Sequence, residues 1–219
     1  MSSADLHRLI LDTACRLLIE HGYERLSMRR LGEAVGVSAT TIYLYYESKD
    51  ALFRAIVDEG MSRLHAELIA ASTASDSAEA RFRRLCEAYV TFGLSNPEFY
   101  EVMFVVRTDR MARFPATNFR QARRNLDLLT DILQDARSLN RSEARVQATA
   151  VWASLHGVVS LLIARRVDVG INEDDLVEAV LANVDVAHLP TAGKAWAETA
   201  NVLPGSDIVH QRPQNNTGT

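Results

Sequence analysis

The 219-residue chain has little cysteine, little proline and no excess of basic charge. Its two cysteines form no Cys/His spacing typical of a zinc site, so we expect no metal and no other cofactor. Cys15 and Cys86 both lie in apolar helical stretches. We expect two reduced core thiols, and a redox-sensing disulfide is the alternative. Five prolines and ten glycines leave room for long helices.

Regular alternation of apolar and polar residues is also missing, which argues against long exposed strands. We therefore expect an all-α protein of about nine helices. Hydrophobic residues make up 47% and charged residues 24%, a composition typical of a soluble globular chain with a sizeable core. The N-terminus is polar and carries Asp5, unlike a signal peptide, so we expect a cytoplasmic protein.

A formal net charge of −4 does not by itself suggest a nucleic-acid binder. Residues 25–54, however, hold five basic and three acidic side chains, so the charge is distributed unevenly. This basic excess is small. One subunit would therefore make few phosphate contacts, and two subunits would be needed to bind DNA well.

Residues 28–47 have the pattern of a helix-turn-helix. Ser27 is placed to cap a first short helix and Ser38 to cap a second. Gly36 between them is placed to end the first helix in the left-handed conformation, and Val37 is the expected apolar plug. The apolar stripe expected on the first helix consists of Leu31, Ala34 and Val35.

The second helix offers hydroxyl groups for DNA. Ile42 and Tyr46 are four residues apart, and we assign this pair to the core. Thr41, Leu44 and Tyr45 should then point away from the core, with Thr40 and Tyr43 at the margins. Their hydroxyl and methyl groups suit phosphate oxygens and base edges. The alternative is a small aromatic core helix that binds no nucleic acid.

Lys49 opens the next helix and is placed to contact a phosphate. A solvated surface lysine is the simpler alternative.

At these residues the chain resembles the TetR family of bacterial transcriptional regulators over about residues 5–65. The matching residues are Ile10, Ala14, Leu17, Gly22, Tyr23, Ser27, Leu31, Ala34, Gly36, Val37, Ser38, Thr41, Ile42, Tyr43, Tyr45, Tyr46, Ser48, Lys49 and Leu52. The resemblance implies a first helix that supports the helix-turn-helix and a fourth that links it to a ligand-binding body. It places DNA contacts at Ser27, Met28, Arg29, Ala39, Thr40, Thr41, Tyr43, Leu44, Tyr45 and Lys49. Ala39 and Leu44 are apolar where a polar reading group is often found, so hydrogen-bonded base readout should depend mainly on Thr40, Thr41 and Arg29.

Apolar periodicity predicts helices on both sides of this motif. The first spans about residues 5–21, ends at Gly22, and should bury a face made of Leu6, Leu9, Ile10, Thr13, Ala14, Leu17 and Leu18. Further helices are expected over about residues 49–71, from the break at 72–78 to Ser95, and over 98–106 and 116–138. A basic loop between the last two carries Arg107, Arg110 and Arg113. These arginines could attract an anion, although an exposed loop explains them equally.

Residues 148–164 contain no charged residue. Seventeen residues are at the short end for a membrane span, and arginines follow closely, so we expect a buried helix and no membrane association. An apolar helix must be covered on all sides, either by its own domain or by a second subunit. With the stripe Leu176, Val177, Val180, Leu181 and Val184 on the last helix, it predicts a four-helix interface of two-fold symmetry.

Trp152, His156 and Gly157 form a W-x-x-x-H-G pattern that resembles the C-terminal domains of one TetR subgroup. His156 could be a hydrogen-bonded core residue, a ligand contact or a titrating switch. The candidate effector pocket consists of Phe92, Tyr100, Met103, Phe104, Phe119, Trp152 and His156, each of which could equally be ordinary core.

We therefore divide the chain into a DNA-binding domain over residues 5–65, an effector-binding and dimerisation domain over 66–189, and a disordered tail over 190–219. The function hypothesis is a homodimeric repressor that leaves a palindromic double-stranded DNA operator when an apolar or aromatic small molecule binds. Two alternative hypotheses are a helical adaptor whose helix-turn-helix binds no DNA, and a helical-bundle enzyme that uses His156 as a general base.

Overall fold

The computed structural model describes residues 2–73, 77–104 and 116–189, except for the side chains of residues 116–122. Within these ranges the chain forms nine helices and no strand, in agreement with the expected all-α class. The helices are α1 (Ser3–Arg25), α2 (Met28–Val35), α3 (Ala39–Tyr45), α4 (Lys49–Ser72), α5 (Ala78–Ser95), α6 (Pro97–Phe104), α7 (Ala116–Arg137), α8 (Arg141–Ile163) and α9 (Glu173–Asn183). The basic loop with Arg107, Arg110 and Arg113 and the tail after residue 189 lie outside the described residues.

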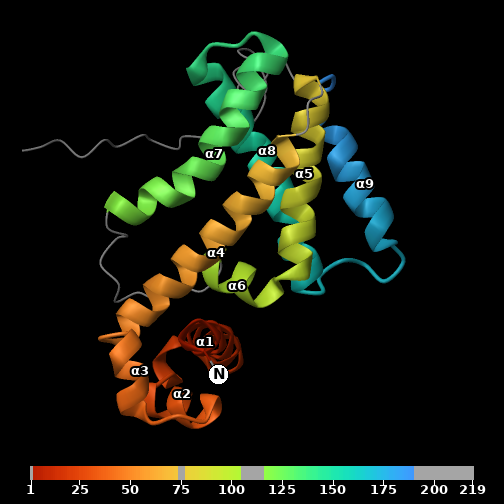
Figure 1. Cartoon of the computed structure of the whole chain (residues 1–219). Coiled ribbons are helices and arrows are strands. Elements are labelled where there is room, and N and C mark those ends of the chain that lie inside the picture. Colours follow the sequence, from red (N-terminus) through yellow and green to blue (C-terminus); the bar gives the residue numbers. More distant parts are fainter. Residues whose placement is uncertain (1, 74–76, 105–115, 190–219) are drawn as a thin grey trace, which may run out of the picture. The chain divides into compact units, whose positions relative to one another are not determined.

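Helices α1, α2 and α3 pack together as a head, and α4 runs from the head into the body formed by α4–α9 (Figure 1). The two helices of the head's motif begin at serine caps, as expected. The Ser27 side chain accepts a hydrogen bond from the Arg30 amide, and Ser38 accepts one from the Thr41 amide at 3.0 Å. Gly36 adopts the left-handed conformation with φ 82°, which turns the chain sharply between α2 and α3.

Gly32 in α2 allows the close approach of this turn. A Cβ atom at Gly32 would lie 2.8 Å from the Val37 carbonyl oxygen and 3.1 Å from the Ala39 amide nitrogen. Any side chain there would push α3 away from α2. This role of Gly32 was not predicted from the sequence.

Two apolar assignments in the head were wrong. Leu9 is 39% exposed, while its neighbour Leu11 is buried instead. The cause is that α1 contacts α2, α4 and α6, so its covered surface is wider than one stripe and displaced from the expected face. Ala34 is also exposed, because α2 is covered only on the side of Leu31 and Met28. Gly22, with φ 75°, interrupts the helical backbone as expected, but the helical run continues to Arg25.

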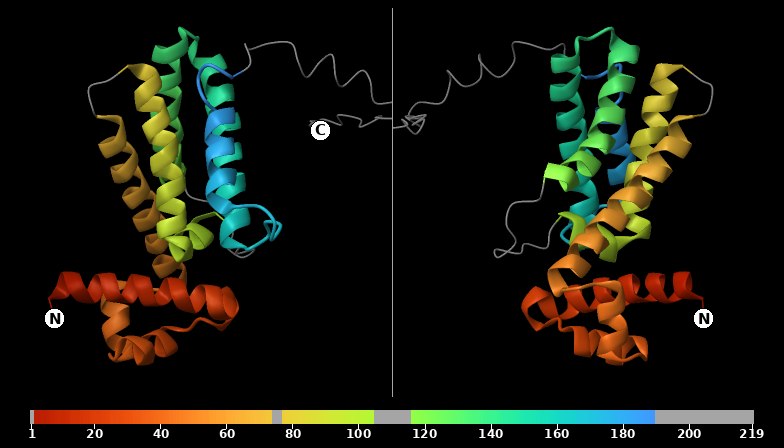
Figure 2. Two further views of the ribbon diagram at one scale, coloured as in Figure 1. Left: turned by 90° about the vertical axis from the view of Figure 1, so that its right-hand side faces the viewer. Right: turned by 60° about the vertical axis from the view of Figure 1, so that its left-hand side comes forward.

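In the body, α4 packs on α5 and α7 on α8, with α9 against α8 and α5 (Figure 2). The expected boundaries of α4, α5 and α7 agree with the structure to within one residue. Cys15 and Cys86 are buried free thiols, as expected, and burial raises the pKa of each well above the ordinary value. Residues 2–189 thus contain one continuous core that extends from the head into the body.

Helix α8 has one buried and one exposed side. Ala148, Val151, Leu155 and Val159 are packed inside the body. Its length and composition would allow it to cross a membrane, with a mean hydropathy of 1.5 over its most apolar window. In the structure, however, it packs against α5, α7 and α9 as a core helix does. Its exposed side carries Val146, Thr149, Ala150, Ala153, Ser154 and Leu161.

Candidate DNA-reading face and body cavity

The outer face of α3 presents three side chains to solvent. Thr40 is exposed, Tyr43 is 53% exposed, and Leu44 is 81% exposed. Ile42 is fully buried beneath them, as expected. Ala39 is half-buried at the start of the helix. An exposed leucine on a short polar helix has no folding role, which favours a contact surface at this position.

Thr41 and Tyr45 were expected to point outward, and both are instead held against the head. The Thr41 hydroxyl lies 2.9 Å from the Ser38 hydroxyl, and both side chains belong to the cap of α3. The Tyr45 hydroxyl lies 3.1 Å from the Ser3 hydroxyl, so α1 covers one side of this ring. Both residues remain half-exposed. The exposed contact candidates on α3 are therefore Thr40, Tyr43 and Leu44.

Tyr46 closes the core side of α3. Its hydroxyl lies 2.8 Å from His7 Nε2 on α1, and burial raises the pKa of Tyr46 to about 12. This hydrogen bond fixes the end of α3 on α1, so that α1 serves as the support of the reading helix.

At the start of α2, Ser27 and Arg29 are exposed and Met28 is not. Met28 is only 5% exposed and belongs to the core, so it does not reach the outer face that the family resemblance implied. Arg29 has a single ion pair, to Glu33 at 3.7 Å, and both side chains are largely in solvent. The Arg29 guanidinium is therefore available to a phosphate or a base edge.

Lys49 has partners within the protein. Its ammonium donates hydrogen bonds to the carbonyl oxygens of Tyr23 at 2.7 Å and Leu26 at 3.1 Å, and lies 4.1 Å from the centre of the Tyr23 ring. The first residue of α4 thus caps the C-terminal end of α1. This differs from the exposed lysine that the sequence suggested.

Arg63 joins the head to the body. From α4 it donates a hydrogen bond to Glu59 at 2.7 Å and lies 3.7 Å from Asp12 of α1. Its guanidinium also lies 4.4 Å from the centre of the Phe99 ring of α6. One side chain therefore contacts three helices, two of which continue to the cavity described next.

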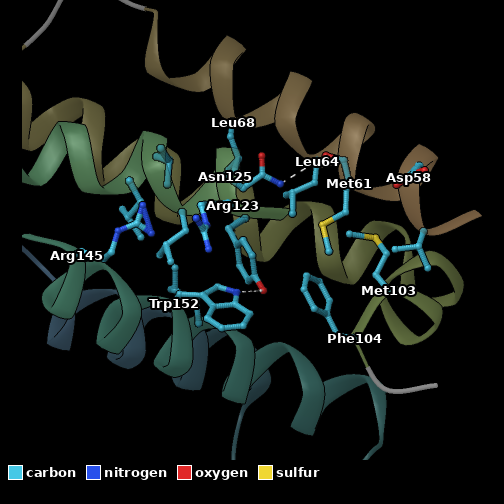
Figure 3. A pocket seen from close by; sticks show the side chains of 16 residues that line it. Asp58, Met61, Leu64, Leu68, Met103, Phe104, Arg123, Asn125, Arg145 and Trp152 are labelled. Atoms are coloured by element: carbon cyan, nitrogen blue, oxygen red, sulfur yellow. Dashed lines mark hydrogen bonds between the residues drawn. The ribbon is translucent and has the colours of Figure 1, made fainter. Parts of the chain in front are cut away.

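The body encloses a cavity of about 500 Å³, a size typical of sites for small organic ligands. Its described lining is largely apolar: Val57, Asp58, Met61, Leu64, Leu68, Leu85, Tyr89, Met103, Phe104, Arg123, Asn125, Leu126, Leu129, Arg145, Trp152 and Leu155. Figure 3 shows Asp58 at one end and Arg145 at the other, with Leu64 and Trp152 on opposite sides between them. Arg145 pairs with Asp127, while burial raises the pKa of Asp58.

Three of the seven sequence candidates line this cavity, namely Met103, Phe104 and Trp152. Three others, Phe92, Tyr100 and His156, do not line it and lie in the packed body behind it. The Phe119 side chain lies outside the described residues. The residues that the sequence reading missed include Tyr89 and the α4 side chains Met61, Leu64 and Leu68. Nothing in their apolar periodicity distinguishes them from ordinary core.

A chain of hydrogen bonds leads from the cavity into the body. Trp152 Nε1 donates to the Tyr89 hydroxyl at 2.9 Å, and the hydroxyls of Tyr89 and Tyr100 are 2.9 Å apart. The Tyr100 hydroxyl lies 2.6 Å from His156 Nδ1, and Ser160 Oγ lies 3.5 Å from His156 Nε2. Burial raises the pKa of Tyr89 to about 12 and lowers that of His156. His156 is thus a hydrogen-bonded residue of the packed body.

Within residues 2–73, 77–104 and 123–189, no group of three or more His, Cys, Asp or Glu side chains is placed to hold a metal ion.

A capped helix-turn-helix joined by one long helix to a helical body defines the class of helix-turn-helix DNA-binding proteins. Comparison with known families agrees with this class. Residues 10–56 match the model for bacterial regulatory proteins of the tetR family, and residues 82–184 match the tetracyclin repressor-like C-terminal domain. Together the two models match more than half of the chain, and the protein belongs to the TetR family.

Curated relatives match over short stretches of the chain. The chain is 42% identical over 57 residues to the HTH-type transcriptional repressor ComR of Escherichia coli, and 43% identical over 61 residues to the HTH-type transcriptional repressor AcnR of Corynebacterium diphtheriae. These matches cover 26% and 28% of this chain. The chain thus spans only 27% and 32% of the length of these two relatives.

Solved structures match over most of the chain. A Rhodococcus sp. RHA1 protein whose function is unknown aligns with a TM-score of 0.69 at 27% identity, covering 85% of this chain and 96% of its own. A tetR-family regulatory protein from Rhodococcus RHA1 aligns with a TM-score of 0.70 at 16% identity, covering 88% and 100%. The second likeness is one of fold alone.

Proposed function

We propose that the protein is a homodimeric transcriptional repressor that a small molecule releases from its operator. The observation that carries this proposal is the outer face of α3, where Thr40, Tyr43 and Leu44 stand exposed on a helix whose caps and core side are fully engaged. The match to the model for bacterial regulatory proteins of the tetR family, over residues 10–56, contains this helix.

In the proposed complex each subunit places α3 in a major groove. Two such helices related by two-fold symmetry read half-sites ~34–36 Å apart, or a multiple of that distance, on a palindromic operator. Arg29 and the α3 hydroxyls supply the few phosphate and base contacts of each subunit. Because one head carries so little positive charge, we expect tight binding only from a dimer.

The exposed side of α8 is the surface we assign to the partner subunit. Val146 is 68% and Leu161 45% exposed, and the side chains between them are small and uncharged. Nothing lies within 4 Å of a Cβ atom added to Gly157, so this surface is open in the single chain. Helix α9 lies beside α8, and its half-buried Leu176, Val177 and Val180 pack on the core of their own subunit. Two copies of α8 and α9 would form a four-helix interface.

Effector release is proposed to start in the body cavity. Its lining is apolar apart from a few polar groups, which suits an apolar or aromatic molecule. Met61, Leu64 and Leu68 of α4 contribute to the lining, and the same helix begins at Lys49, directly after α3. An effector that fits only one position of α4 would thus favour one spacing of the two heads.

DNA binding is tested by selecting binding sites from random duplexes and measuring affinity by gel shift. Tyr43→Ala removes an exposed side chain that has no hydrogen bond in the described structure, so we expect at least a tenfold loss of specific binding with unchanged circular dichroism. Arg83→Ala, on the exposed side of α5, is the matched control. If selection enriches no sequence, the regulator proposal is wrong and the adaptor alternative gains support.

Dimerisation is tested by sedimentation at micromolar concentration. Ala153→Glu puts a charge on the exposed side of α8, whereas Ala66→Glu makes the same change on the exposed side of α4. We expect a dimer for the parent chain and the α4 variant, and a monomer for the α8 variant, because a buried unpaired carboxylate opposes association. A monomeric parent chain would contradict the proposal.

The enzyme alternative requires His156 to act as a general base. Its Nδ1 atom is engaged by the buried Tyr100 hydroxyl, and no carboxylate or nucleophile is bonded to it in the described residues. The family to which the chain belongs consists of regulators. We therefore prefer a cytoplasmic regulator to an enzyme.

A further inference from the structure

The hydrogen-bonded chain Trp152–Tyr89–Tyr100–His156 begins at the cavity wall and ends on α8. Trp152 and Tyr89 line the cavity, and the bond between them is drawn in Figure 3. Tyr100 is fully buried behind Tyr89, and His156 is half-buried beyond it, next to Ser160. Four side chains from three helices thus connect the cavity to the helix assigned to the subunit interface.

The hydrogen bond at the cavity end of this hydrogen-bonded chain has a fixed donor. The indole of Trp152 can only donate, so the Tyr89 oxygen must accept from it. In the resting direction, Tyr89 donates to Tyr100, Tyr100 donates to His156 Nδ1, and His156 carries its proton on Nε2, towards Ser160. In the reversed direction, His156 carries its proton on Nδ1 and donates to Tyr100, and Tyr100 donates to Tyr89.

The two directions differ in whether the Tyr89 hydroxyl proton has an acceptor within the protein. In the resting direction every hydroxyl proton of the chain has an acceptor. In the reversed direction the Tyr89 proton has none, because the described hydrogen-bond partners of Tyr89 are Trp152 and Tyr100 alone. The lining around it consists mostly of Leu, Met and aromatic side chains. A buried hydroxyl without an acceptor is costly, so the protein's own hydrogen-bonding groups favour the resting direction.

At the His156 end, the hydrogen bond with Ser160 can form in both directions. The Ser160 hydroxyl can accept from Nε2–H or donate to a bare Nε2. His156 remains neutral in both states, since the Nε2–H bond breaks as the Nδ1–H bond forms and the total number of protons is unchanged. The half-exposed ring can exchange these protons with water. The missing acceptor at Tyr89 is therefore the main difference between the two directions.

We propose that the cavity binds an uncharged apolar molecule with a carbonyl oxygen. This oxygen accepts a hydrogen bond from Tyr89 and so reverses the donor–acceptor direction of the Trp152–Tyr89–Tyr100–His156 hydrogen bonds. Binding would move the His156 proton from Nε2 to Nδ1, beside the half-buried Gly157 and five residues before the exposed Leu161. The inference rests on the proposed effector function and specifies the chemical class of the effector. Tyr89 is the binding residue, and His156 reports on the ligand without touching it.

The test uses the full chain with ¹⁵N-labelled histidine. Long-range proton–nitrogen correlation spectra distinguish the two neutral tautomers, and His156→Gln assigns the signal among the six histidines of the chain. The probe is methyl heptyl ketone, and its control is the alkene with a methylene group in place of the carbonyl oxygen. We expect the Nε2–H tautomer in the free protein and a shift to Nδ1–H with the ketone alone. The ketone should bind roughly 3–10 times more tightly than the alkene.

Tyr89→Phe removes the hydroxyl and keeps the ring. In this variant the ketone should bind no better than the alkene, and the His156 tautomer should not respond to it. An Nδ1–H tautomer in the free parent protein, equal affinities for ketone and alkene, or ketone binding without a tautomer change would each overturn the proposal. So would the failure of methyl ketones of every tested chain length to bind. All these outcomes leave operator binding intact, whereas failure of the regulator proposal itself would abolish the gel shift.

Discussion

Lys49 and Arg29 are both candidates for phosphate contact, but their replacement should affect different properties. Replacing Lys49 should lower the stability of the fold, whereas replacing Arg29 should weaken operator binding. Lys49→Met removes an ammonium that donates to two carbonyl oxygens at the end of α1 and lies over the Tyr23 ring. Charge-assisted hydrogen bonds contribute about 1.5–3 kcal/mol each, but water can reach these half-buried carbonyls, so we expect a loss of about 1–3 kcal/mol in all. For a chain of this size, that lowers Tm by roughly 3–10 °C.

Arg29→Met removes only an exposed pair with Glu33, so stability should stay within about 0.5 kcal/mol. Its effect should appear in operator binding. If Arg29 contacts a phosphate, the slope of log affinity against log salt falls by ~0.9 for each subunit. Urea unfolding and salt-dependent gel shifts measure the two effects separately. These roles of Lys49 and Arg29 are contradicted if Lys49→Met is as stable as the parent chain, or if Arg29→Met is the less stable of the two.

Three further substitutions test packing and titration. Gly93→Ala would place a Cβ atom 2.5 Å from Val159 Cγ1, so overpacking of about 1–3 kcal/mol should outweigh the ~1 kcal/mol gained in helix propensity; a more stable variant in urea unfolding would contradict this. Burial raises the pKa of Asp58 in the folded chain, so the ionised group destabilises the fold at neutral pH. Asp58→Asn should raise Tm at pH 7, with a gain that fades as the pH falls through the raised folded pKa and is absent below the unfolded pKa of 3.8; a gain that grows in acid would oppose the assignment. Burial lowers the pKa of His156 below 6.5, so the unfolded chain binds the proton more readily and stability falls as pH drops below about 6.5. His156→Gln should flatten that part of the pH–stability curve, and an unchanged curve would count against it.

The helix-turn-helix was largely predictable because its determinants are local. Ser27, Gly36 and Ser38 act on amides and carbonyls within a few residues, so their spacing alone indicates where helices begin and end. Thr41 and Tyr45 were assigned to the outer face because a helical period says which residues share a side. It does not say that Ser3, from the start of α1, covers one edge of that side.

The cavity was predictable only in part, for a related reason. Trp152 and Phe104 were candidates because they are large aromatic residues, yet Tyr100 has the same character and is packed away from the cavity. Which side chains line an empty space depends on the angles between α4, α5, α7 and α8, and these angles result from packing over the whole body. The partners of Lys49 were hidden likewise, since Tyr23 and Leu26 lie more than twenty residues away in sequence.

The three contacts of Arg63 bear on the construction of hybrid regulators. A reading head cut from this chain before Arg63 would lose the side chain that faces Asp12 of its own first helix and the Phe99 ring of the body. A graft onto another body should therefore carry α4 at least as far as this arginine and meet an aromatic ring where Phe99 stands. Without that ring, the transplanted head could still recognise its operator and yet no longer respond to the molecule that the new body binds.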